Sequence, residues 1–452
     1  MKYWLVVVGA VLLGMCAAQQ LPSRDDPLYD YLARENPTPS ALLRTPRSGD
    51  EFLRTLPSNL RPSTQIARWK LRDAPLLPAR ATLLMVETQA FAFPDRSDWR
   101  TAETTYRIVG AWAIDAHTLL EVVWSDMRRR AGDNPSVFGT VPYATLTLQT
   151  GTVGWRIGYS TLRWLGGYSG GMLVNDEMPP VPHAAVQFPV RVPLLGEWRF
   201  EQFLSQFEQD GARTWWGARR LERDFGAQWT LALAEAFKAL QLPEGVVSQL
   251  IPYYLYQKWY SDSRRGSGWF NYLAEVGVVY KPDTQNRVYL FWLMDDMRAP
   301  TAFGGSSSTP RKVATLVGTR LYPAPNTRLI LELVRSDGTP TGGVYDNSNH
   351  PRRYAYYYKD LPMGHPIGAN RIGFYARAEH ESSRWLYTVE HATLRRFHKY
   401  RPGTRGYVLG ITVGYQVSER GVISLQYRAS HLRDTSAPVK QAGWYLQVVA
   451  RF

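Results

Sequence analysis

Apolar and polar residues alternate along most of the chain beyond about residue 81. In 407–415 every second residue is apolar: Tyr407, Leu409, Ile411, Val413 and Tyr415. The intervening positions are small or polar, and 422–430 repeats the pattern. A period of two is typical of a β-strand with one apolar and one polar face. The chain is therefore predicted to be all-β over this region.

The same pattern predicts eighteen strands. The connections between them alternate in length, although 209–213 is a brief member of the long set. The strands are expected near 81–92, 104–114, 118–128, 142–150, 152–160, 184–192, 197–208, 213–224, 228–237, 268–281, 286–295, 311–322, 326–336, 370–380, 384–393, 405–417, 421–431 and 443–452. Short turns on one side and longer loops on the other are typical of an outer-membrane antiparallel β-barrel. A soluble β-sandwich gives no reason for this alternation. An even number of strands places both barrel ends on the short-turn side, which is the periplasm in such proteins.

The last predicted strand has an alternating apolar face that ends on an aromatic residue. Its members are Trp444, Leu446, Val448, Ala450 and Phe452. A sheet can span a bilayer only as a closed barrel, because every backbone group in lipid needs a partner. A final strand with this pattern is similar to the assembly signal of outer-membrane barrels. We therefore expect these five residues to direct membrane assembly.

The first 80 residues do not follow the strand pattern. Residues 1–18 combine Lys2, an apolar run over 3–15 and a small-residue cleavage region, which indicates a secretory signal peptide. A membrane anchor is the first alternative, although the run is short of the roughly 20 residues that span a bilayer. A lipoprotein signal at Cys16 is the second.

Residues 19–80 are expected to form a periplasmic helical segment that plugs the barrel of 81–452. Helix starts are predicted at Ser23 or Asp25 and again at Ser48 or Asp50. A flexible export linker is the alternative for this segment.

Composition narrows the class of protein further. The single cysteine lies in the predicted signal peptide, so the mature chain would hold no disulfide or thiolate metal site. Aromatic residues make up 13%, with 27 Tyr and 16 Trp, and such rings favour membrane interfaces and sugar sites. The 53 basic and 39 acidic residues give a net charge of +14. This charge favours an anionic partner, and nucleic acid is implausible for an exported protein.

Four segments carry a resemblance to a known family. Residues 163–204, 218–237, 250–259 and 356–377 resemble, in order, blocks of the Wzi capsule assembly family. The resemblance covers roughly 25–452, although Trp164-Leu165-Gly166-Gly167 stands where the family usually has Trp-Gly-Pro-Gly. It implies an outer-membrane barrel closed by a helical plug, acting as a lectin that holds capsular polysaccharide at the cell surface.

Clusters of aromatic and basic residues in the predicted outer loops fit such a role. Sugars present apolar faces edged with hydroxyls, and acidic sugars add a demand for Arg and Lys. The candidate polysaccharide-binding residues are Trp164, Tyr168, Trp259, Tyr260, Arg264, Arg265, Arg395, Arg396, Lys399 and Tyr400. The alternative is that the aromatics form an interfacial girdle and the cations bridge lipopolysaccharide phosphates.

Enzymatic interpretations have little support in the sequence. Residues 167–171, Gly-Tyr-Ser-Gly-Gly, fit G-x-S-x-G, but a nucleophile elbow needs a buried strand before Ser169 and a helix after it, and neither is evident. An acid/base site could be assembled from carboxylates and histidines, namely Asp295, Asp296, His365, His391 and His398. His380, Glu381 and His391 do not form a compact metal-ligand set. We predict no catalytic residue, cofactor or metal.

Together these observations predict a bacterial outer-membrane barrel that binds surface polysaccharide, with its loops at the cell surface. Its expected partners are an acidic polysaccharide, lipopolysaccharide or other outer-membrane lipid, and the barrel assembly machinery. The alternative is a porin that passes solutes through its lumen. The two differ at the plug, because eighteen open strands leave an aqueous channel.

Overall fold

The fold is taken from a computed structural model. It describes residues 82–92, 103–115, 118–128, 140–150, 152–160, 162, 164, 167–174, 181–209, 211–226, 228–240, 270–283, 286–295, 312–324, 326–339, 342–345, 355–358, 361–365, 367–396, 405–418, 421–433 and 438–451. The predicted signal peptide, the predicted helices of 19–80 and Phe452 lie outside these residues.

Eighteen strands of the described chain form one antiparallel sheet, as predicted from the period of two. They are β1 (Thr82–Ala92), β2 (Glu103–Asp115), β3 (Thr118–Arg128), β4 (Thr140–Thr150), β5 (Val153–Ser160), β6 (Val181–Val192), β7 (Gly196–Gln209), β8 (Ala212–Phe225), β9 (Trp229–Ala239), β10 (Phe270–Tyr280), β11 (Arg287–Asp295), β12 (Lys312–Ala324), β13 (Thr327–Ser336), β18 (Arg371–Ser382), β19 (Trp385–Arg396), β20 (Arg405–Ser418), β21 (Gly421–Arg433) and β22 (Pro438–Arg451). All eighteen predicted strands are present, and the largest shift is at β22, which begins at Pro438 rather than near residue 443.

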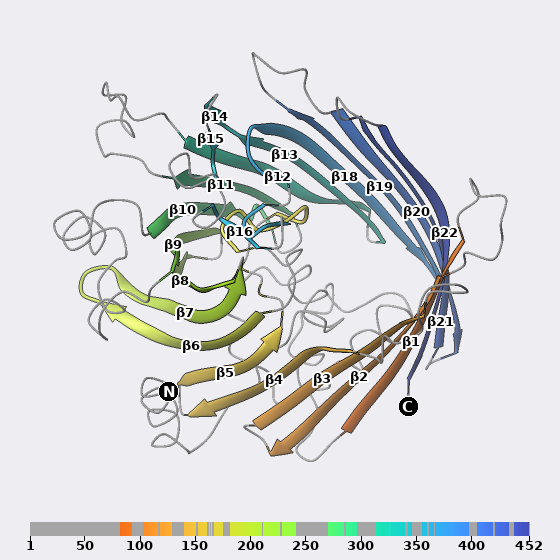
Figure 1. The fold of residues 1–452 in the computed structure, drawn as a ribbon, viewed down its shortest axis with the longest axis horizontal. Helices are drawn as coiled ribbons and strands as arrows, with labels where there is room; N and C mark the ends of the chain where they lie inside the picture. Colours follow the sequence, from red (N-terminus) through yellow and green to blue (C-terminus); the bar gives the residue numbers. More distant parts are fainter. Residues whose placement is uncertain are drawn as a thin grey trace.

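The sheet closes on itself to form a barrel. β1 pairs with β22 in antiparallel register, from Met85 opposite Arg451 to Ala92 opposite Trp444. β1 also pairs with β2 on its other side, so neither edge of this strand is free. Figure 1 shows the strands following one another around a ring. Closure pairs the backbone groups that a sheet edge would leave open, which is the condition for spanning a bilayer.

Large apolar side chains cover the outward face of the sheet. On β11, β12 and β13 the outward positions include Leu290, Val317 and Leu333, which are 43%, 46% and 48% exposed. Burying each such side chain in an apolar medium is worth roughly 1.5–3 kcal/mol. This belt therefore fits the hydrocarbon region of a membrane, and the fold is that of an outer-membrane β-barrel.

Aromatic rings border the belt at two levels. At the short-turn end Trp385 packs on Tyr415 with 4.6 Å between ring centroids, and Trp229 packs on Tyr280 at 4.5 Å. Tyr407 lies eight residues before Tyr415 on the same face of β20. That separation is about 27 Å along the strand, or roughly 21 Å along the barrel axis at a tilt of about 40°. The spacing is close to the apolar band of about 25 Å that outer-membrane barrels present.

Connection lengths alternate as predicted, the brief connection 210–211 between β7 and β8 being the expected exception, and two other predictions are corrected. Residues 193–195, 226–228 and 383–384 are short turns, whereas 240–269 and 337–370 are long connections. The connection expected over 432–443 is mostly strand, because β21 and β22 stay paired out to Arg433 opposite Pro438. β19 likewise continues to Arg396, so the loop expected from residue 394 starts later. In both places the neighbouring strand supplies backbone partners that extend the ladder.

No helix among the described residues has the length and apolar character needed to cross a membrane. Four two-residue strands complete the described regular structure, namely β14 (Gly338–Thr339), β15 (Gly342–Gly343), β16 (Tyr357–Tyr358) and β17 (Leu361–Pro362). They belong to the long connection between β13 and β18, and Figure 1 shows β16 inside the ring of strands. The part of this connection around β16 therefore lies inside the barrel.

Candidate functional site in the barrel interior

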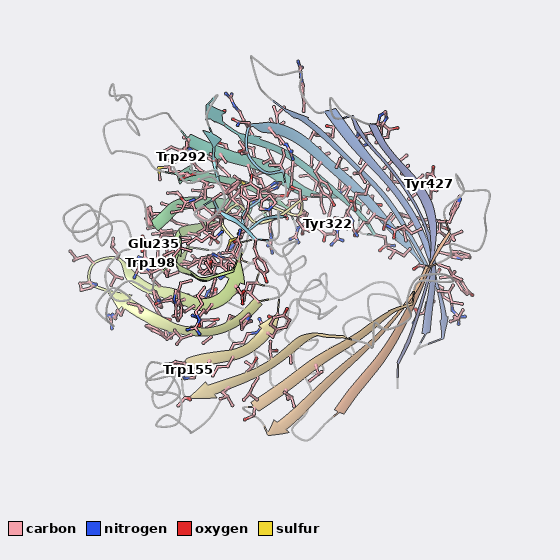
Figure 2. The ribbon with its side chains drawn as sticks, in the orientation of Figure 1. Trp155, Trp198, Glu235, Trp292, Tyr322 and Tyr427 are labelled. Carbon is pink, nitrogen blue, oxygen red and sulfur yellow. The ribbon has the colours of Figure 1, made fainter. Side chains whose placement is uncertain are left out.

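Two long connections pack against the inner wall of the barrel. We call the described residues of 162–174, between β5 and β6, the first inward segment, and the described residues of 344–370, between β13 and β18, the second inward segment. Their buried apolar residues form one cluster with inward residues of the strands. From the segments come Leu162, Trp164, Met172, Leu173, Val174, Val344, Tyr345, Tyr356, Tyr358, Met363 and Ile367, and from the wall Val181, Phe203, Phe207, Trp216, Ala218, Ala234, Ala236, Leu273, Tyr289, Phe291, Leu293, Ala314, Leu316 and Val334. The lumen beside these strands is thus filled by a packed apolar core rather than by water. Figure 2 shows side chains crowding this part of the ring.

Hydrogen bonds between side chains and backbone join the two segments to each other and to the wall. The Tyr345 hydroxyl donates to the carbonyl of Met172 at 2.7 Å. The Tyr356 hydroxyl donates to the carbonyl of Leu173 at 3.1 Å and accepts from Nε1 of Trp216 at 2.7 Å. All these groups are buried, so each bond replaces one that water would otherwise make.

Close backbone approach explains two glycines in the segments. A Cβ added at Gly167 would lie 2.6 Å from Oε1 of Glu332. A Cβ added at Gly364 would lie 2.3 Å from the Tyr345 ring and 2.5 Å from the carbonyl oxygen of Met172. Real Cβ atoms do not approach other heavy atoms so closely. A larger residue at 364 would collide with backbone, and one at 167 would displace the Glu332 carboxylate.

Three buried charged side chains of the wall hold the backbone of the inward segments. Nζ of Lys238 on β9 donates to the carbonyl oxygens of Ala355 at 2.7 Å and Tyr357 at 2.6 Å. Oδ2 of Asp295 on β11 accepts from the backbone N–H of Tyr345 at 2.9 Å. The third is Glu332 on β13, which is 1% exposed. Charge-assisted bonds of this kind are about twice as strong as neutral ones.

Glu332 collects donors from the first inward segment and from the wall. Its carboxylate accepts from the backbone N–H of Tyr168 at 2.5 Å and of Ser169 at 2.8 Å. It also accepts from the hydroxyls of Ser169 and Tyr289. Four donors satisfy both carboxylate oxygens, so the buried charge is compensated and the tip of the first segment is fixed to the wall.

Ser169 lies beside His365, although the two are far apart in the sequence. Oγ of Ser169 is 3.1 Å from Nε2 of His365. Nδ1 of His365 accepts the backbone N–H of Ile367 at 3.2 Å, so in the neutral ring the proton is on Nε2 and is donated to Ser169. A general base would have to accept from the serine at that nitrogen. Because Ser169 gives its own proton to Glu332, this arrangement is a structural link between the two segments.

The burial of His365 makes this link sensitive to pH. Desolvation lowers the pKa of His365 from 6.5 to about 3. Above pH 6.5 the ring is neutral in both folded and unfolded chains, and its contribution to stability is complete. As the pH falls from 6.5 towards about 3, the unfolded chain binds a proton that the folded chain does not, and stability is lost.

We expect wild type to lose on the order of 3 kcal/mol at pH 4.5 relative to pH 7.5 through this one group. The variant His365→Gln should lose less stability over the same interval. Unfolding temperatures of the detergent-solubilised barrel at the two pH values measure this. His380→Gln removes an exposed histidine on β18 and should keep the full pH dependence. Equal pH dependence in wild type and His365→Gln would contradict the assignment.

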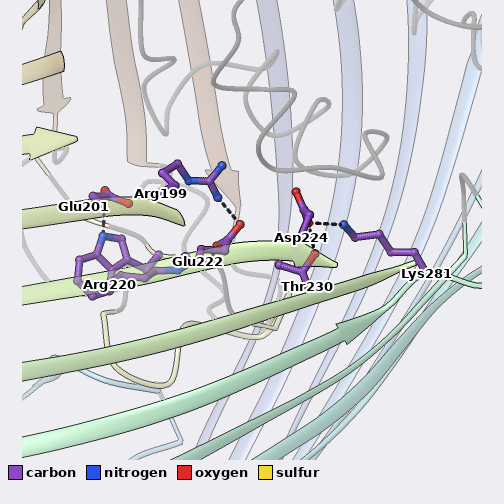
Figure 3. Close-up of polar contacts among 8 residues, drawn as sticks. Arg199, Glu201, Arg220, Glu222, Asp224, Thr230 and Lys281 are labelled. Carbon is purple, nitrogen blue, oxygen red and sulfur yellow. Dashed lines mark hydrogen bonds and ion pairs between the residues drawn. The ribbon is translucent and has the colours of Figure 1, made fainter. Parts of the chain in front are cut away.

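A row of charged residues lies on the inner wall nearer the short-turn end, as Figure 3 shows. Arg199 on β7 and Arg220 on β8 both pair with Glu222. Farther along β8, Asp224 accepts from Nζ of Lys281 at 3.0 Å and from the hydroxyl of Thr230.

Lys281 follows directly after β10, and its side chain is 1% exposed. Burial lowers the pKa of Lys281, and the nearby Arg287 and Arg199 lower it further, while Asp224 opposes the shift. The inner wall at this level is therefore polar and carries charges of both signs. It differs from the apolar core formed around the inward segments.

The structure moves Trp164 and Tyr168 from the exposed loop where they were expected to the barrel interior. Trp164 is 5% exposed, donates from Nε1 to Glu201 at 3.0 Å and packs edge-on against Phe203 at 5.5 Å between centroids. The hydroxyl of Tyr168 accepts from Nη1 of Arg320 at 3.1 Å. An apolar ring in a loop is stabilised by burial, and the wall offers that burial. Their role in sugar binding stays a prediction.

The other candidate residues divide into two groups. Arg395 and Arg396 belong to β19 rather than to the following loop, and the exposed Arg395 shares the outward face with Tyr387 and Val389. The remaining candidates lie outside the described residues, namely Trp259, Tyr260, Arg264, Arg265, Lys399 and Tyr400. Their role in binding likewise stays a prediction.

The acid/base residues considered from sequence do not meet. Asp295 binds the backbone of Tyr345, and His365 contacts Ser169. His391 lies on the outward face of β19, opposite Ala376. Asp296 and His398 lie outside the described residues. Among the described residues, no group of three or more His, Cys, Asp or Glu side chains is placed to hold a metal ion.

Lys238 and Glu332 were not recognised from the sequence. Each occupies an inward position of a strand, where a charged residue is ordinary for a barrel that encloses water. The only signal was that both are surrounded by apolar inward neighbours, such as Ala236 on β9 and Val334 on β13.

No family model matches the chain, and no curated protein matches it. Among solved structures it is similar to Wzi of Escherichia coli, described as an outer membrane protein involved in group 1 capsule assembly and a carbohydrate-binding β-barrel. The TM-score is 0.67 at 12% identity, covering 96% of this chain and 100% of that one. Pseudomonas aeruginosa OccK1 (OpdK) matches at a TM-score of 0.48 and 12% identity, and OccK10 (OpdN) at 0.49 and 10%. Each covers 82% of this chain, and 98% and 99% of its own. At these identities the similarity is one of fold.

Proposed function

We propose that this protein is a non-enzymatic outer-membrane barrel that binds surface polysaccharide. The observation that carries the proposal is the apolar core inside the barrel, in which two inward segments occupy lumen beside β7–β13. A packed core in the lumen would obstruct a channel. In a binding protein the same core would serve as a rigid base for the outer loops, and loops held by a rigid scaffold lose less conformational entropy when they bind a ligand.

The similarity of fold to Wzi supports the same proposal. That protein is described as a carbohydrate-binding barrel involved in capsule assembly, and the match extends over nearly the whole of both chains. The four segments that resemble the Wzi family include parts of both inward segments. We infer that the ligand is a capsular or related exopolysaccharide, and that its acidic groups are met by loop arginines and lysines.

The orientation that we propose places the long connections at the cell surface and both barrel ends in the periplasm. Thr82 and Arg451 lie at the short-turn end, because Met85 pairs with Arg451 and Thr82 pairs with Trp112 just before the 116–117 turn. Short turns face the periplasm in outer-membrane barrels. Insertion by the barrel assembly machinery, with residues 19–80 in the periplasm, belongs to the same proposal.

The double variant Arg264→Gln/Arg265→Gln is expected to be retained less on immobilised acidic polysaccharide. Loss of two loop cations should weaken retention roughly three- to tenfold at low salt and less at high salt, where charges are screened beyond about 8 Å. Trp259→Ala should weaken retention at every salt concentration, because stacking is not a screened Coulomb interaction. Column retention of the folded, detergent-solubilised barrel over a salt series measures both effects.

The matched control is Arg191→Gln/Arg384→Gln, which removes two exposed cations at the short-turn end. It should be retained like wild type. If the double variant at 264 and 265 is also retained like wild type at low salt, these cations do not bind the polysaccharide.

A porin is the second candidate, and the row of charged residues on β7 and β8 favours it. Polar inward residues such as Glu222 and Asp224 are what a water-filled passage requires. The two candidates differ in conductance. A porin gives large, steady openings in a planar bilayer, whereas a barrel filled by inward segments gives none.

A further inference from the structure

Charged side chains occupy the outward face of β8 and β9 towards the long-connection end. Nε of Arg219 donates to Oε1 of Glu235, its direct partner across the two strands. The hydroxyl of Tyr272 on β10 donates to Oε2 of Glu235 at 2.7 Å. Arg219 and Glu235 lie on the opposite face of their strands from Trp216 and Lys238, which bind the second inward segment. The outward face of the barrel therefore holds an ion pair.

An apolar patch adjoins this ion pair on the same face. Phe237, two residues beyond Glu235, lies over β8, since a Cβ added at Gly217 would be 2.4 Å from its ring. Phe237, Ala239 and Tyr272 form a buried group that is separate from the core in the lumen. We call the following five residues the outer cluster: Arg219, Glu235, Phe237, Ala239 and Tyr272.

The outer cluster lies at the height of the membrane. Trp229 marks the short-turn edge of the apolar belt on β9, and Glu235 is six residues farther along the strand. That separation is about 20 Å along the strand, or roughly 15 Å along the barrel axis, so Glu235 falls within the apolar band of about 25 Å. Charged side chains on the lipid face destabilise a barrel at this depth. The outer cluster is therefore poorly suited to direct contact with acyl chains.

The outer cluster is also covered, unlike the belt beside it. Phe237 is 0% exposed, whereas Leu233, four residues below it on the same face of β9, is 41% exposed. Outward side chains that only stand side by side keep their lipid-facing surface open, as Leu233 does. Phe237 is buried within a single copy of the chain, so residues of the same chain supply the cover.

We propose that the connection 240–269 packs over the outer cluster, between the barrel wall and the membrane. Both of its ends are at the cluster, because Ala239 belongs to the cluster and Phe270 is the direct partner of Ala239. Glu235 is about 13 Å below Ala239 along β9, a distance that four extended residues span, so the connection is long enough to reach it and return. Residues 246–260 are mostly apolar or aromatic, which matches the apolar part of the cluster.

A second copy of the chain and lipid are the competing occupants of this face. A second copy would bury the cluster only on association, whereas Phe237 is already buried within one copy. Lipid would leave the pair of Arg219 and Glu235 against acyl chains, which offer no polar partner. The connection that starts and ends at the cluster meets neither objection.

A covering connection changes where the candidate ligand-binding residues would lie. Trp259, Tyr260, Arg264 and Arg265 all belong to 240–269. A connection held against the wall would present them beside the barrel at the membrane surface, and a bound polysaccharide would run along the membrane. This step rests on the proposed function, whereas the cover itself does not.

The first test measures whether lipid reaches the outer cluster. The single cysteine of the chain lies in the predicted signal peptide, so Ala274→Cys would place a lone cysteine on the outward face of β10, opposite Glu235. A nitroxide spin label there, in the full-length barrel reconstituted in phospholipid vesicles, should collide with dissolved oxygen roughly threefold less often than one at Ala376→Cys, because close-packed protein excludes lipid.

Ala376 is the matched control, because it is an outward alanine of β18 at the same height. It lies six residues before Ser382, which is opposite Trp385 at the short-turn aromatic level. Ala274 likewise lies six residues before Tyr280, which is opposite Trp229 at that level.

Cross-linking then identifies the cover. Second cysteines are introduced one at a time over 246–258 in the Ala274→Cys background and oxidised. A disulfide needs Cα atoms within about 7 Å of each other. We expect at least one position to form an intramolecular disulfide roughly tenfold faster than the same position paired with Ala376→Cys. Heat-modifiable migration shows which variants are folded, and the spin-label measurement needs only the single alanine substitution.

Three results would overturn the proposal. Equal oxygen collision at Ala274→Cys and Ala376→Cys would mean that lipid contacts the cluster. Disulfides between chains would mean that a second copy covers it. A shielded label with no intramolecular disulfide at any position would assign the cover to another part of the chain. None of these measurements involves polysaccharide, so column retention tests the proposed function separately.

Discussion

Replacing Glu332 with glutamine is expected to open the barrel interior. The carboxylate accepts hydrogen bonds from the backbone of Tyr168 and Ser169 and from two hydroxyls. A glutamine has one acceptor oxygen and brings an NH₂ group that faces the same donors, so buried N–H groups lose their partners. The cost is roughly 3 kcal/mol or more, which frees the tip of the first inward segment.

Planar-bilayer conductance measures this opening. Wild type should show no large steady openings, and Glu332→Gln should show frequent ones. Glu390→Gln is the matched control, since Glu390 lies on β19 and pairs with Arg377 at 3.7 Å. Large steady openings in wild type would remove the polysaccharide-binding proposal in favour of the porin. A closed Glu332→Gln channel would show that Glu332 does not hold the segment in place.

Replacing Lys238 with methionine should release the second inward segment. Its ammonium group is fully buried and donates to Ala355, Tyr357 and the side chain of Gln209. Methionine keeps a similar length and leaves the two carbonyl oxygens without this donor. A loss of about 2 kcal/mol raises the population in which the segment is detached by roughly 30-fold.

Cysteine labelling reports that population. The single cysteine of the chain lies in the predicted signal peptide, so a cysteine introduced at Ala355 would be the only one in the mature protein. Its reaction with a maleimide should be roughly 30-fold faster in the Lys238→Met background. A cysteine at Ala218, buried on the wall, should stay unreactive. The matched charge control is Lys281→Met, and equal labelling rates in wild type and Lys238→Met would show that Lys238 does not hold the segment.

The strands could be predicted because their signal is local. On β20 the alternation of Tyr407, Ile411 and their neighbours indicates a strand with one apolar face, and the exposed fractions of 47% and 41% confirm which face is outward. The environment of each outward position is lipid, which any strand of the barrel meets in the same way. Position in the sequence is then enough to assign the face.

Strand ends were predicted less well. β22 starts at Pro438 because Val439 and its neighbours find partners on β21. Whether the ladder continues depends on the length of the adjacent strand, which lies elsewhere in the sequence. Asp434, Ser436 and Pro438 indicate a turn but do not say where pairing stops.

The sequence by itself determined an antiparallel outer-membrane barrel, its strand number and its apolar outward face. Only the tertiary structure decided that the first and second inward segments lie in the lumen. The bonds that hold them join residues far apart, such as Ser169 to Glu332, 163 positions away, and Ser169 to His365, 196 positions away. The alternation of apolar and polar residues along a strand indicates which face contacts lipid, and the outward face contacts lipid all around the belt. A contact across the lumen depends on how closure of the barrel brings β5, β13 and β18 around one space, which no local pattern records.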